Sequence, residues 1–258
     1  MISIKQMKLI TSLQVKKYRN EHNKFLAEGD KIADMILNSN YKIDAVYATN
    51  EWLSNHQPNK SIDYFEVSNK DLEKISGLKT PQNVIVVADI PEDDFNPHSL
   101  KNNLSLVFDE IKDPGNFGSI IRVADWFGIK NIICSPDSVD LYNPKVIQAT
   151  MGSFCNVDVH YHPLKDLFEI NKHELHLPVF GTMLDGENIY QTKLDTNAII
   201  LFGNESKGIN LDYLSYLTQK IKIPTYNKNN KSAESLNIAI ATGIVCSEFR
   251  RTEQVLSV

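Results

Sequence analysis

Residues 104–128, LSLVFDEIKDPGNFGSIIRVADWFG, contain the pattern that decides the fold. The first five residues form an almost continuous apolar run, as in a strand that is buried on both faces. A Pro-Gly turn follows, and Asn116 is placed to cap a helix predicted over 117–127. Apolar residues recur along this helix at i, i+4 and i+7, so that one face points at the sheet: Ile120, Ala124 and Phe127. A strand, a turn and an amphipathic helix in this order predict one unit of a parallel α/β sheet.

Five more apolar runs of strand length follow this unit, and helical patterns separate most of them. These candidate strands are 131–134, 157–160, 179–183, 198–202 and 220–223. Gly, Asp or Pro stands at or near the end of each run. The alternation therefore predicts a parallel sheet with ligand chemistry at the carboxyl ends of its strands.

A smaller three-layer α/β domain is predicted ahead of this sheet, because short apolar runs alternate there with helical patterns. The expected elements are strands at 43–48, 64–67 and 84–88 and helices at 30–37 and from residue 69. Asn69 and Asp71 are candidate caps of the second helix. Residues 89–103, DIPEDDFNPHSLKNN, hold two prolines and four acids without periodicity, as in a linker. We therefore predict two domains, 1–98 and 104–258.

The composition is that of a folded globular protein, with 42% hydrophobic and 23% charged residues, which excludes a disordered or collagen-like chain. We find no run of 18 apolar residues and no signal-peptide pattern, so the sequence predicts a cytoplasmic protein without a membrane segment. The three cysteines, Cys134, Cys155 and Cys246, are too few and too far apart for a disulfide framework or a CxxC metal pair. We expect them to be buried thiols.

Charge is distributed unevenly along the chain. The formal net charge is −5, but residues 1–42 contain eight basic and four acidic side chains. This excess allows a phosphate-facing edge, for which Lys16, Lys17 and Arg19 are the candidates. The alternative is a solvated helix face, because eight basic side chains over 42 positions do not make a dense patch.

Arg122 lies about 200° around the predicted helix from Ile120, and therefore faces away from the core stripe. Two interpretations are open for it. Arg122 either forms a surface ion pair with Asp125, three residues further on, or projects into an interface that holds a ligand.

A second stretch, 199–209, reads IILFGNESKGI and ends a buried strand in Gly203. A missing Cβ at this position lets a ligand or another backbone come close. Gly203 and Gly208 have the spacing of a phosphate loop, but the Lys and the Ser or Thr that follow in such a loop are absent, which excludes a nucleotide-phosphate loop. Glu205 is a candidate either for a helix cap or for a site.

A third stretch, 235–251, reads SLNIAIATGIVCSEFRR and predicts a helix that Ser235 caps. Its middle is apolar on nearly every side, so we expect it to be buried on all faces. Small residues permit close approach of another helix and suggest a subunit interface: Ala239, Ala241 and Gly243. Asn237 is a polar amide within this apolar helix and needs partners, which fits a site better than packing.

Together these stretches resemble the three motifs of the SpoU (TrmH-like) RNA ribose 2′-O-methyltransferases of the SPOUT superfamily. The resemblance covers about residues 104–251, and the matching positions occur in the family's order. They are Asp113, Pro114, Asn116, Gly118, Arg122, Ala124, Phe127 and Gly128 in the first motif, Gly203, Asn204, Glu205 and Gly208 in the second, and Ile223, Pro224, Ser235, Leu236 and Asn237 in the third. Residues 17–19 and 25–29 resemble the start of the ribosomal-protein-L30e-like substrate-binding domain. The chain departs from the family pattern at Ser206, at Ala239 and in a longer loop before Ser235.

The resemblance implies an α/β SPOUT domain with a deep trefoil knot, a homodimer, and S-adenosylmethionine bound inside the knot. By motif position, the implied cofactor contacts are Gly203, Ile223 and Leu236, with Thr150 and Phe202 as neighbours. The implied catalytic arginine is Arg122. Asn116, Glu205, Ser235 and Asn237 would position the ribose, the arginine and the loops. A sulfonium cofactor carries no phosphates, so neither a phosphate loop nor a metal is expected.

The implied reaction is methyl transfer to a ribose 2′-hydroxyl, with ribosomal RNA as the favoured substrate over transfer RNA. The alternatives are a tRNA ribose methyltransferase, a SPOUT enzyme that methylates a base nitrogen, and a non-catalytic RNA-binding or ribosome-assembly protein. Four histidines within 17 residues also raise the possibility of a zinc site: His160, His162, His173 and His176. No cysteine or acid completes a known zinc spacing around them, so we do not predict a metal.

Overall fold

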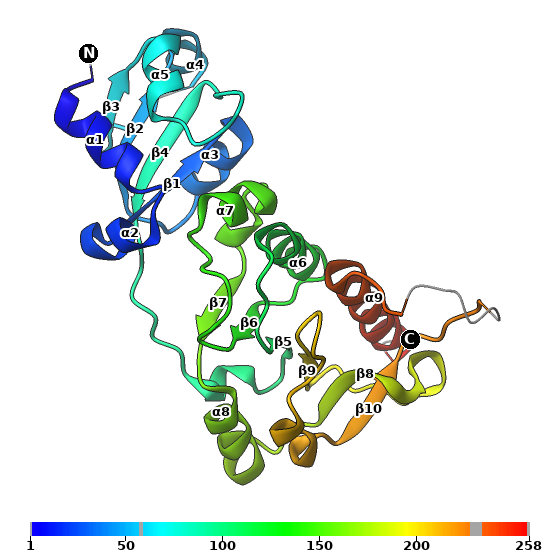
Figure 1. The fold of residues 1–258 in the computed structure, drawn as a ribbon. Helices are drawn as coiled ribbons and strands as arrows, with labels where there is room; N and C mark the ends of the chain where they lie inside the picture. Colours follow the sequence, from blue (N-terminus) through cyan, green and yellow to red (C-terminus); the bar gives the residue numbers. More distant parts are fainter. Residues whose placement is uncertain (1, 57–58, 228–233, 257–258) are drawn as a thin grey trace. The chain divides into compact units, whose positions relative to one another are not determined.

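The computed structural model of the chain describes residues 2–56, 59–227 and 234–256 (Figure 1). Its contacts divide the chain into two compact units. The N-terminal unit comprises Met1–Glu92 and Asp140–Cys155, and the C-terminal unit comprises Asp93–Val139 and Asn156–Val258. The segment Asp140–Cys155 therefore belongs to the first unit by its contacts, whereas the predicted domain boundary at residues 89–103 assigns it to the second domain.

The N-terminal unit is built on a four-stranded sheet in the order β1-β4-β2-β3. Its strands are β1 (Lys24–Glu28), β2 (Ile43–Ala48), β3 (Asp63–Glu66) and β4 (Val84–Asp89). β4 runs antiparallel to both β1 and β2, while β3 runs parallel to β2. Five helices come from the described residues of the segment Met1–Glu92: α1 (Ile4–Ser12), α2 (Lys16–His22), α3 (Asp30–Leu37), α4 (Asn50–Asn55) and α5 (Asn69–Ile75).

The sequence predicts α3 and β2 with their observed bounds and misses α1, α2, β1 and α4. The residue that caps α5 also differs from the prediction. Ser68, rather than Asn69 or Asp71, precedes the helix, and its side chain accepts the backbone N–H of Asp71. The short helix therefore begins at Asn69, as expected, but with a different capping residue.

The segment Asp140–Cys155 joins the N-terminal unit through polar and aromatic contacts. It contains α7 (Pro144–Thr150) and the short helix η2 (Ser153–Cys155). Asp140 pairs with Arg19, and the buried ring of Phe25 packs between Tyr142 and Phe154 at centroid distances of 4.6 and 5.9 Å. These interactions link residues more than 100 positions apart, so the pattern of local sequence does not reveal them.

The C-terminal unit contains a six-stranded sheet in the order β10-β8-β9-β5-β6-β7. Its strands are β5 (Leu104–Phe108), β6 (Asn131–Cys134), β7 (Asp158–Tyr161), β8 (Val179–Asn188), β9 (Ala198–Phe202) and β10 (Gln219–Lys222). Every neighbouring pair is parallel, which confirms the predicted parallel sheet. β5 and β9 pair from Leu104 with Ala198 to Phe108 with Phe202, so their carboxyl ends lie together.

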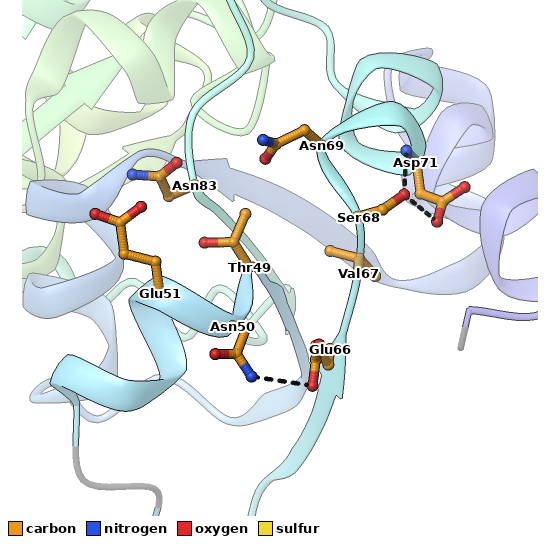
Figure 2. A pocket seen from close by; sticks show the side chains of 9 residues that line it. All are labelled: Thr49, Asn50, Glu51, Glu66, Val67, Ser68, Asn69, Asp71 and Asn83. Carbon is orange, nitrogen blue, oxygen red and sulfur yellow. Dashed lines mark hydrogen bonds between the residues drawn. The ribbon is translucent and has the colours of Figure 1, made fainter.

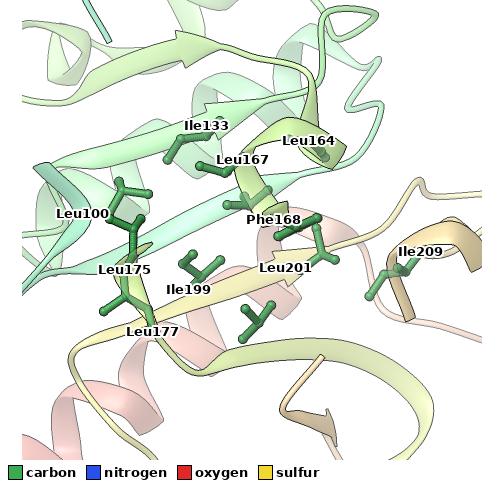
Figure 3. Packing of buried hydrophobic residues seen from close by; sticks show 12 residues of the cluster. Leu100, Ile133, Leu164, Leu167, Phe168, Leu175, Leu177, Ile199, Leu201 and Ile209 are labelled. Carbon is green, nitrogen blue, oxygen red and sulfur yellow. The ribbon is translucent and has the colours of Figure 1, made fainter. Parts of the chain in front are cut away.

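The helices of this unit are α6 (Pro114–Trp126), α8 (Leu164–Ile170) and α9 (Ile238–Leu256), with the short helices η1 (Pro97–Leu100), η3 (Asn171–Leu175), η4 (Ile189–Gln191) and η5 (Leu211–Tyr216). α8 and η3 cover one part of the sheet with apolar side chains (Figure 3). Leu167 and Phe168 of α8 pack there with Ile199 and Leu201 of β9, and all four are buried. The near-continuous apolar runs of the central strands are thus explained by burial.

α6 begins earlier than predicted, and its cap is Asp113 rather than Asn116. The Asp113 carboxylate accepts the backbone N–H of Asn116 at 2.7 Å, and Pro114 occupies the first helical position, where no N–H is needed. Ile120 and Ala124 are fully buried, as the helical pattern predicts. Because Asp113 caps the helix, the Asn116 side chain is available for other partners.

α9 begins at Ile238, three residues after the predicted cap Ser235. Asn237 takes the capping role, because its Oδ1 accepts the backbone N–H groups of Ala239 and Ile240. The prediction that this helix is buried on all faces is wrong for the single chain, in which Ile240 is 58% exposed. α9 packs instead along α6, where Gly243 lies against Val123.

The trefoil knot depends on the path that leads from β10 into α9. Residues 228–233 of this path lie outside the described residues, so the knot stays a prediction. Within the part of the chain that the structure describes, no helix has the length and apolarity needed to cross a bilayer.

Candidate active site

The three stretches singled out in the sequence meet in the C-terminal unit, beyond the carboxyl ends of β5 and β9. Asn116, near the start of α6, donates from its Nδ2 to Glu205 Oε1 in the loop after β9. Its Oδ1 accepts from Nδ2 of Asn237, the cap of α9, at 2.9 Å. One amide therefore links all three stretches through side-chain hydrogen bonds, which confirms that they form one cluster.

A cavity of about 780 Å³ lies beside this cluster. Seven of the residues predicted for the site line it: Phe202, Gly203, Glu205, Ile223, Ser235, Leu236 and Asn237. Its volume falls within the range of ordinary cofactor and ligand pockets, roughly 300 to 1,000 Å³. Four of the five predicted cofactor residues thus share one pocket, while their roles stay predictions.

The pocket walls suit an uncharged ring system better than a phosphate chain. Apolar side chains from β10, α9 and the loop after β9 line it, including Ile209, Ile221 and Val245. Gly203, Ile223 and Leu236 border the same space. These residues fit the nucleoside of a sulfonium cofactor, which needs apolar contact and backbone hydrogen bonds but no phosphate loop.

Gly203 is required by the chain itself. A Cβ at this position would clash with the backbone of Gly208 and Ile209. The loop folds back here because Asn204 and Gly208 exchange two backbone hydrogen bonds of 2.9 Å. Of the two explanations that the sequence allows, close approach of another backbone is the one that the structure shows.

Arg122 is exposed on α6 and is not among the residues that line the pocket. Its predicted surface partner, Asp125, instead accepts a hydrogen bond from Asn156 Nδ2 at 3.1 Å. Arg122 has neither an ion pair nor a hydrogen bond to any other side chain within 2–56, 59–227 and 234–251. Its guanidinium is therefore available to a ligand or to a partner chain.

Thr150 lies in the N-terminal unit, at the end of α7, and the described residues around the cavity do not include it. It is fully buried, and its hydroxyl donates to the Ile147 carbonyl at 2.6 Å and accepts the Gly152 N–H at 3.2 Å. These bonds give the side chain a local structural role within its own helix end.

The three predicted RNA-binding residues lie on or beside α2, but they differ in exposure. Lys16 and Lys17 are exposed. The prediction for Arg19 is wrong, because its side chain is only 2% exposed and is held inside the N-terminal unit. It donates to the carbonyls of Leu13 and Gln14 at 3.0 and 3.1 Å and pairs with Asp140 at 2.7 Å.

Several site residues were not found from the sequence. Asp109 anchors the end of the loop after β9, and β8 adds Thr182, Met183 and Asp185 to the pocket. Asn204 was identified as a motif position, but its role as the anchor at the start of this loop was not. Asp109 had a usable signal, since it directly follows a buried strand whose carboxyl end faces the site. β8 extends five residues beyond its predicted end, and Asp185 was not placed on this strand because residues 185–188 are polar or glycine.

Two carboxylates at the site have displaced pKa values. Burial raises the pKa of Asp109 above its usual value, although the Asn210 N–H that it accepts opposes the shift. The pKa of Asp185 lies below its usual value because Lys220 donates a hydrogen bond to it at 2.9 Å. Asp109 therefore carries its charge at an energetic cost, as expected of a buried carboxylate that is held for its geometry.

A second pocket, of about 630 Å³, lies in the N-terminal unit where β2 and β3 end (Figure 2). Its lining is polar, with Asn50 bonded to Glu66 and Ser68 bonded to Asp71. None of the residues predicted for the site lines it.

The histidines lie in separate local contacts. His160 pairs with Asp93 at 2.7 Å and His173 with Glu169 at 3.4 Å. Among the described residues, no three His, Cys, Asp or Glu side chains are grouped as metal ligands. Burial raises the pKa of the Cys134 thiol, and that of Cys246 to about 12, so both are inert, buried thiols as predicted; Cys155 is half-buried.

Comparison with protein families places both parts of the chain. Residues 103–247 match the SpoU rRNA Methylase family, and residues 5–86 match the MRM3-like substrate binding domain. The first match covers more than half of the chain and includes the matching positions of all three motifs.

Several relatives align with nearly the whole chain. The 23S rRNA (guanosine(2553)-2′-O)-methyltransferase RlmP of Bacillus subtilis is 27% identical, over 92% of this chain and 93% of that protein. A TrmH-family protein from Porphyromonas gingivalis has a solved structure that is 33% identical with a TM-score of 0.88, covering 98% and 99% of the two chains. The AdoMet-bound rRNA methyltransferase from Sinorhizobium meliloti is 27% identical with a TM-score of 0.84, covering 98% and 97%. The chain belongs to the SpoU rRNA methylase family.

Proposed function

We propose that the protein transfers a methyl group from S-adenosylmethionine to a ribose 2′-hydroxyl of ribosomal RNA. The observation that carries this proposal is the hydrogen-bonded cluster of Asn116, Glu205 and Asn237 beside a pocket of cofactor size. Family membership and the rRNA substrate in the name of the Bacillus subtilis relative support it.

The pocket residues of the C-terminal unit would hold the cofactor. Gly203, Ile223 and Leu236 offer backbone groups, and the apolar side chains around them exclude water. When bound, the cofactor supplies a methyl group on a positively charged sulfur. The AdoMet complex of the Sinorhizobium meliloti relative supports this assignment.

Arg122 would act on the ribose. A ribose hydroxyl is a poor nucleophile until its developing negative charge is stabilised, and a guanidinium that is always protonated provides that stabilisation. Such positioned groups contribute about 10²-fold to 10⁴-fold to a rate. Glu205, which Asn116 holds in place, would position the ribose and stabilise its own loop. The rest of the rate acceleration would come from holding the two substrates close together.

The N-terminal unit would bind the RNA substrate. Its match to a substrate-binding domain supports this role, and the exposed Lys16 and Lys17 provide positive charge.

We propose a homodimer through the C-terminal unit. Trp126 of α6 is 85% exposed and Ile240 of α9 is 58% exposed, an unusual amount of apolar surface on two helices that pack together. A dimer would also explain the free guanidinium of Arg122. Light scattering should give twice the chain mass of 29.3 kDa, and a monomer that is fully active would contradict the proposal.

Incubation with labelled S-adenosylmethionine and total RNA from a strain that lacks the gene tests the activity. The proposal predicts label in ribosomal RNA, in a dinucleotide that resists alkaline hydrolysis because its 2′-hydroxyl is blocked. Label in an alkali-sensitive nucleotide would indicate base methylation, label in transfer RNA would change the substrate, and no label would favour a binding protein.

A further inference from the structure

The loop 203–210, here named the Glu205 loop, is tied at both ends to the two residues that follow β5. At its start, Asn204 Nδ2 donates to the Glu110 carbonyl at 3.1 Å. At its end, the Asn210 N–H donates to Asp109 Oδ2 at 3.1 Å. The loop therefore has two anchors that are independent of the Asn116 contact.

Asn204 also forms hydrogen bonds within the loop. Its Oδ1 accepts the backbone N–H groups of Ser206 and Lys207 at 2.9 and 3.1 Å, and its own backbone pairs with Gly208. Glu205 lies in the sequence between Asn204 and the two residues whose N–H groups the Asn204 side chain accepts. Its backbone is thereby confined, and its carboxylate stays within reach of Asn116.

The partners of these anchors are themselves fixed. Glu110 adopts a φ of 57°, in the left-handed region that few residues other than glycine adopt, and its N–H donates to Ser135 Oγ at 2.8 Å. Ser135 is buried. The Glu110 carbonyl is therefore held as an acceptor for Asn204 by a conformation that needs support from neighbouring residues.

Asp109 is a charged group in a buried position. Its side chain is 7% exposed, and its carboxylate accepts the Asn210 N–H that closes the Glu205 loop. Among the hydrogen bonds of the described chain, no residue of the proposed reaction contacts its carboxylate, while its backbone N–H donates to the Phe202 carbonyl within the sheet. Burying a carboxylate costs free energy unless the carboxylate is hydrogen-bonded. Here the carboxylate holds the end of the Glu205 loop, which explains why a buried charge is present.

We propose that Asn204 and Asp109 are positioning residues for methyl transfer, which act by clamping the Glu205 loop so that Glu205 meets Asn116. The inference rests on the proposed function. It assigns to these two side chains an effect on turnover that they exert through Glu205. Asn204 also lines the pocket, but its amide is bonded to the Glu110 carbonyl and to the backbone N–H groups of Ser206 and Lys207.

Two substitutions separate the contacts of Asn204. Asn204→Asp keeps the oxygen that accepts from Ser206 and Lys207 but loses the N–H that donates to Glu110, whereas Asn204→Ala loses both. Asn96→Ala is the matched control, because Asn96 makes the same kind of side-chain bond to His98 at the start of η1. We expect kcat to fall about 100-fold in Asn204→Ala, since a displacement of about 1 Å has this effect, and less in Asn204→Asp.

The Kd for S-adenosylmethionine should change much less than kcat, which distinguishes a positioning role from collapse of the pocket. For Asp109, the conservative variant Asp109→Asn keeps an oxygen that accepts the Asn210 N–H and should retain wild-type kcat. Asp109→Ala should not. A wild-type kcat in both alanine variants would overturn the inference.

Hydrogen exchange of residues 203–210, measured by mass spectrometry, tests the clamp without requiring activity. The amide hydrogens of Ser206 and Lys207 should exchange faster in Asn204→Ala and remain protected in Asn204→Asp and Asn96→Ala. Unchanged protection in Asn204→Ala would refute the clamp. Absence of transfer by the wild type would instead refute the proposed function, and the exchange result would still decide the clamp.

Discussion

The side-chain amide of Asn237 donates to Oδ1 of Asn116 at 2.9 Å, although 121 positions separate the two residues in the sequence. Asn237 caps α9, and Asn116 lies in the first turn of α6, so the bond fixes the start of one helix against the start of the other. The Nδ2 of Asn116 in turn donates to Glu205 Oε1. The side-chain amide of Asn116 thus links the three motif stretches to one another.

Replacing Asn116 should therefore reduce methyl transfer more than cofactor binding. Asn116→Asp removes the donor and places a carboxylate against Glu205, so we expect a rate about 100-fold below wild type, measured under saturating RNA and cofactor. Ser119→Ala on the same helix removes only a bond to the Gly115 carbonyl and serves as the control. A normal rate for Asn116→Asp would show that the cluster is structural.

Arg122→Ala should abolish transfer while RNA and S-adenosylmethionine still bind, because Arg122 lies outside the pocket and has no structural partner in the described chain. Arg122→Lys retains the charge but not the planar donor group, and should recover only part of the rate. Rates come from label transfer and affinities from titration. A fully active alanine variant would assign the hydroxyl's activation to another group.

Gly203→Ala and Gly208→Ala should differ in cofactor affinity. A methyl group at Gly203 collides with the backbone of the same loop, whereas Gly208, at a φ of 71°, has open space around its missing Cβ. We expect about 5-fold to 150-fold weaker binding for Gly203→Ala, from roughly 1 to 3 kcal/mol of overpacking. Gly208→Ala should show only the backbone strain, roughly 1 kcal/mol in folding stability. Equal cofactor affinities in calorimetry would contradict the assigned loop geometry.

Arg19→Ala and Lys17→Ala should affect different properties of the protein. Loss of Arg19 leaves Asp140 without its ion pair, and breaking such a buried pair costs about 3 to 5 kcal/mol in the free energy of unfolding. Lys17→Ala removes an exposed charge and should weaken RNA binding and flatten its dependence on salt. Denaturant titration and binding at several salt concentrations measure the two effects. A stable Arg19→Ala variant would contradict the internal role of Arg19.

The apolar runs were sufficient to predict much of the C-terminal sheet. β5, β6 and β9 have their predicted bounds because each is a short apolar run closed by turn residues. Helix caps were less predictable, since Asp, Asn and Ser cap equally well and lie close together before α5, α6 and α9. α2 was missed because it is short, polar and lacks a capping side chain.

The candidate site was predictable where its chemistry is local and not where it depends on tertiary contact. The motif residues converge as expected, but the sequence does not reveal that Arg19 faces Asp140 or that Asn204 reaches the Glu110 carbonyl. A charged residue in a short helix has the same local pattern whether it is exposed or paired inside the fold. Such residues are assigned only when the partner, far away in the sequence, is placed.

We assign the cluster of Asn116, Glu205 and Asn237 to methyl transfer to a sugar oxygen. Once the labelled nucleotide in ribosomal RNA is mapped, a synthetic fragment with a 2′-deoxy sugar at that single position tests the claim most directly. We predict full transfer to the ribose fragment and none to the deoxy fragment, with both bound equally well. Transfer to the deoxy fragment would show that the methyl group goes to the base, and would contradict the account.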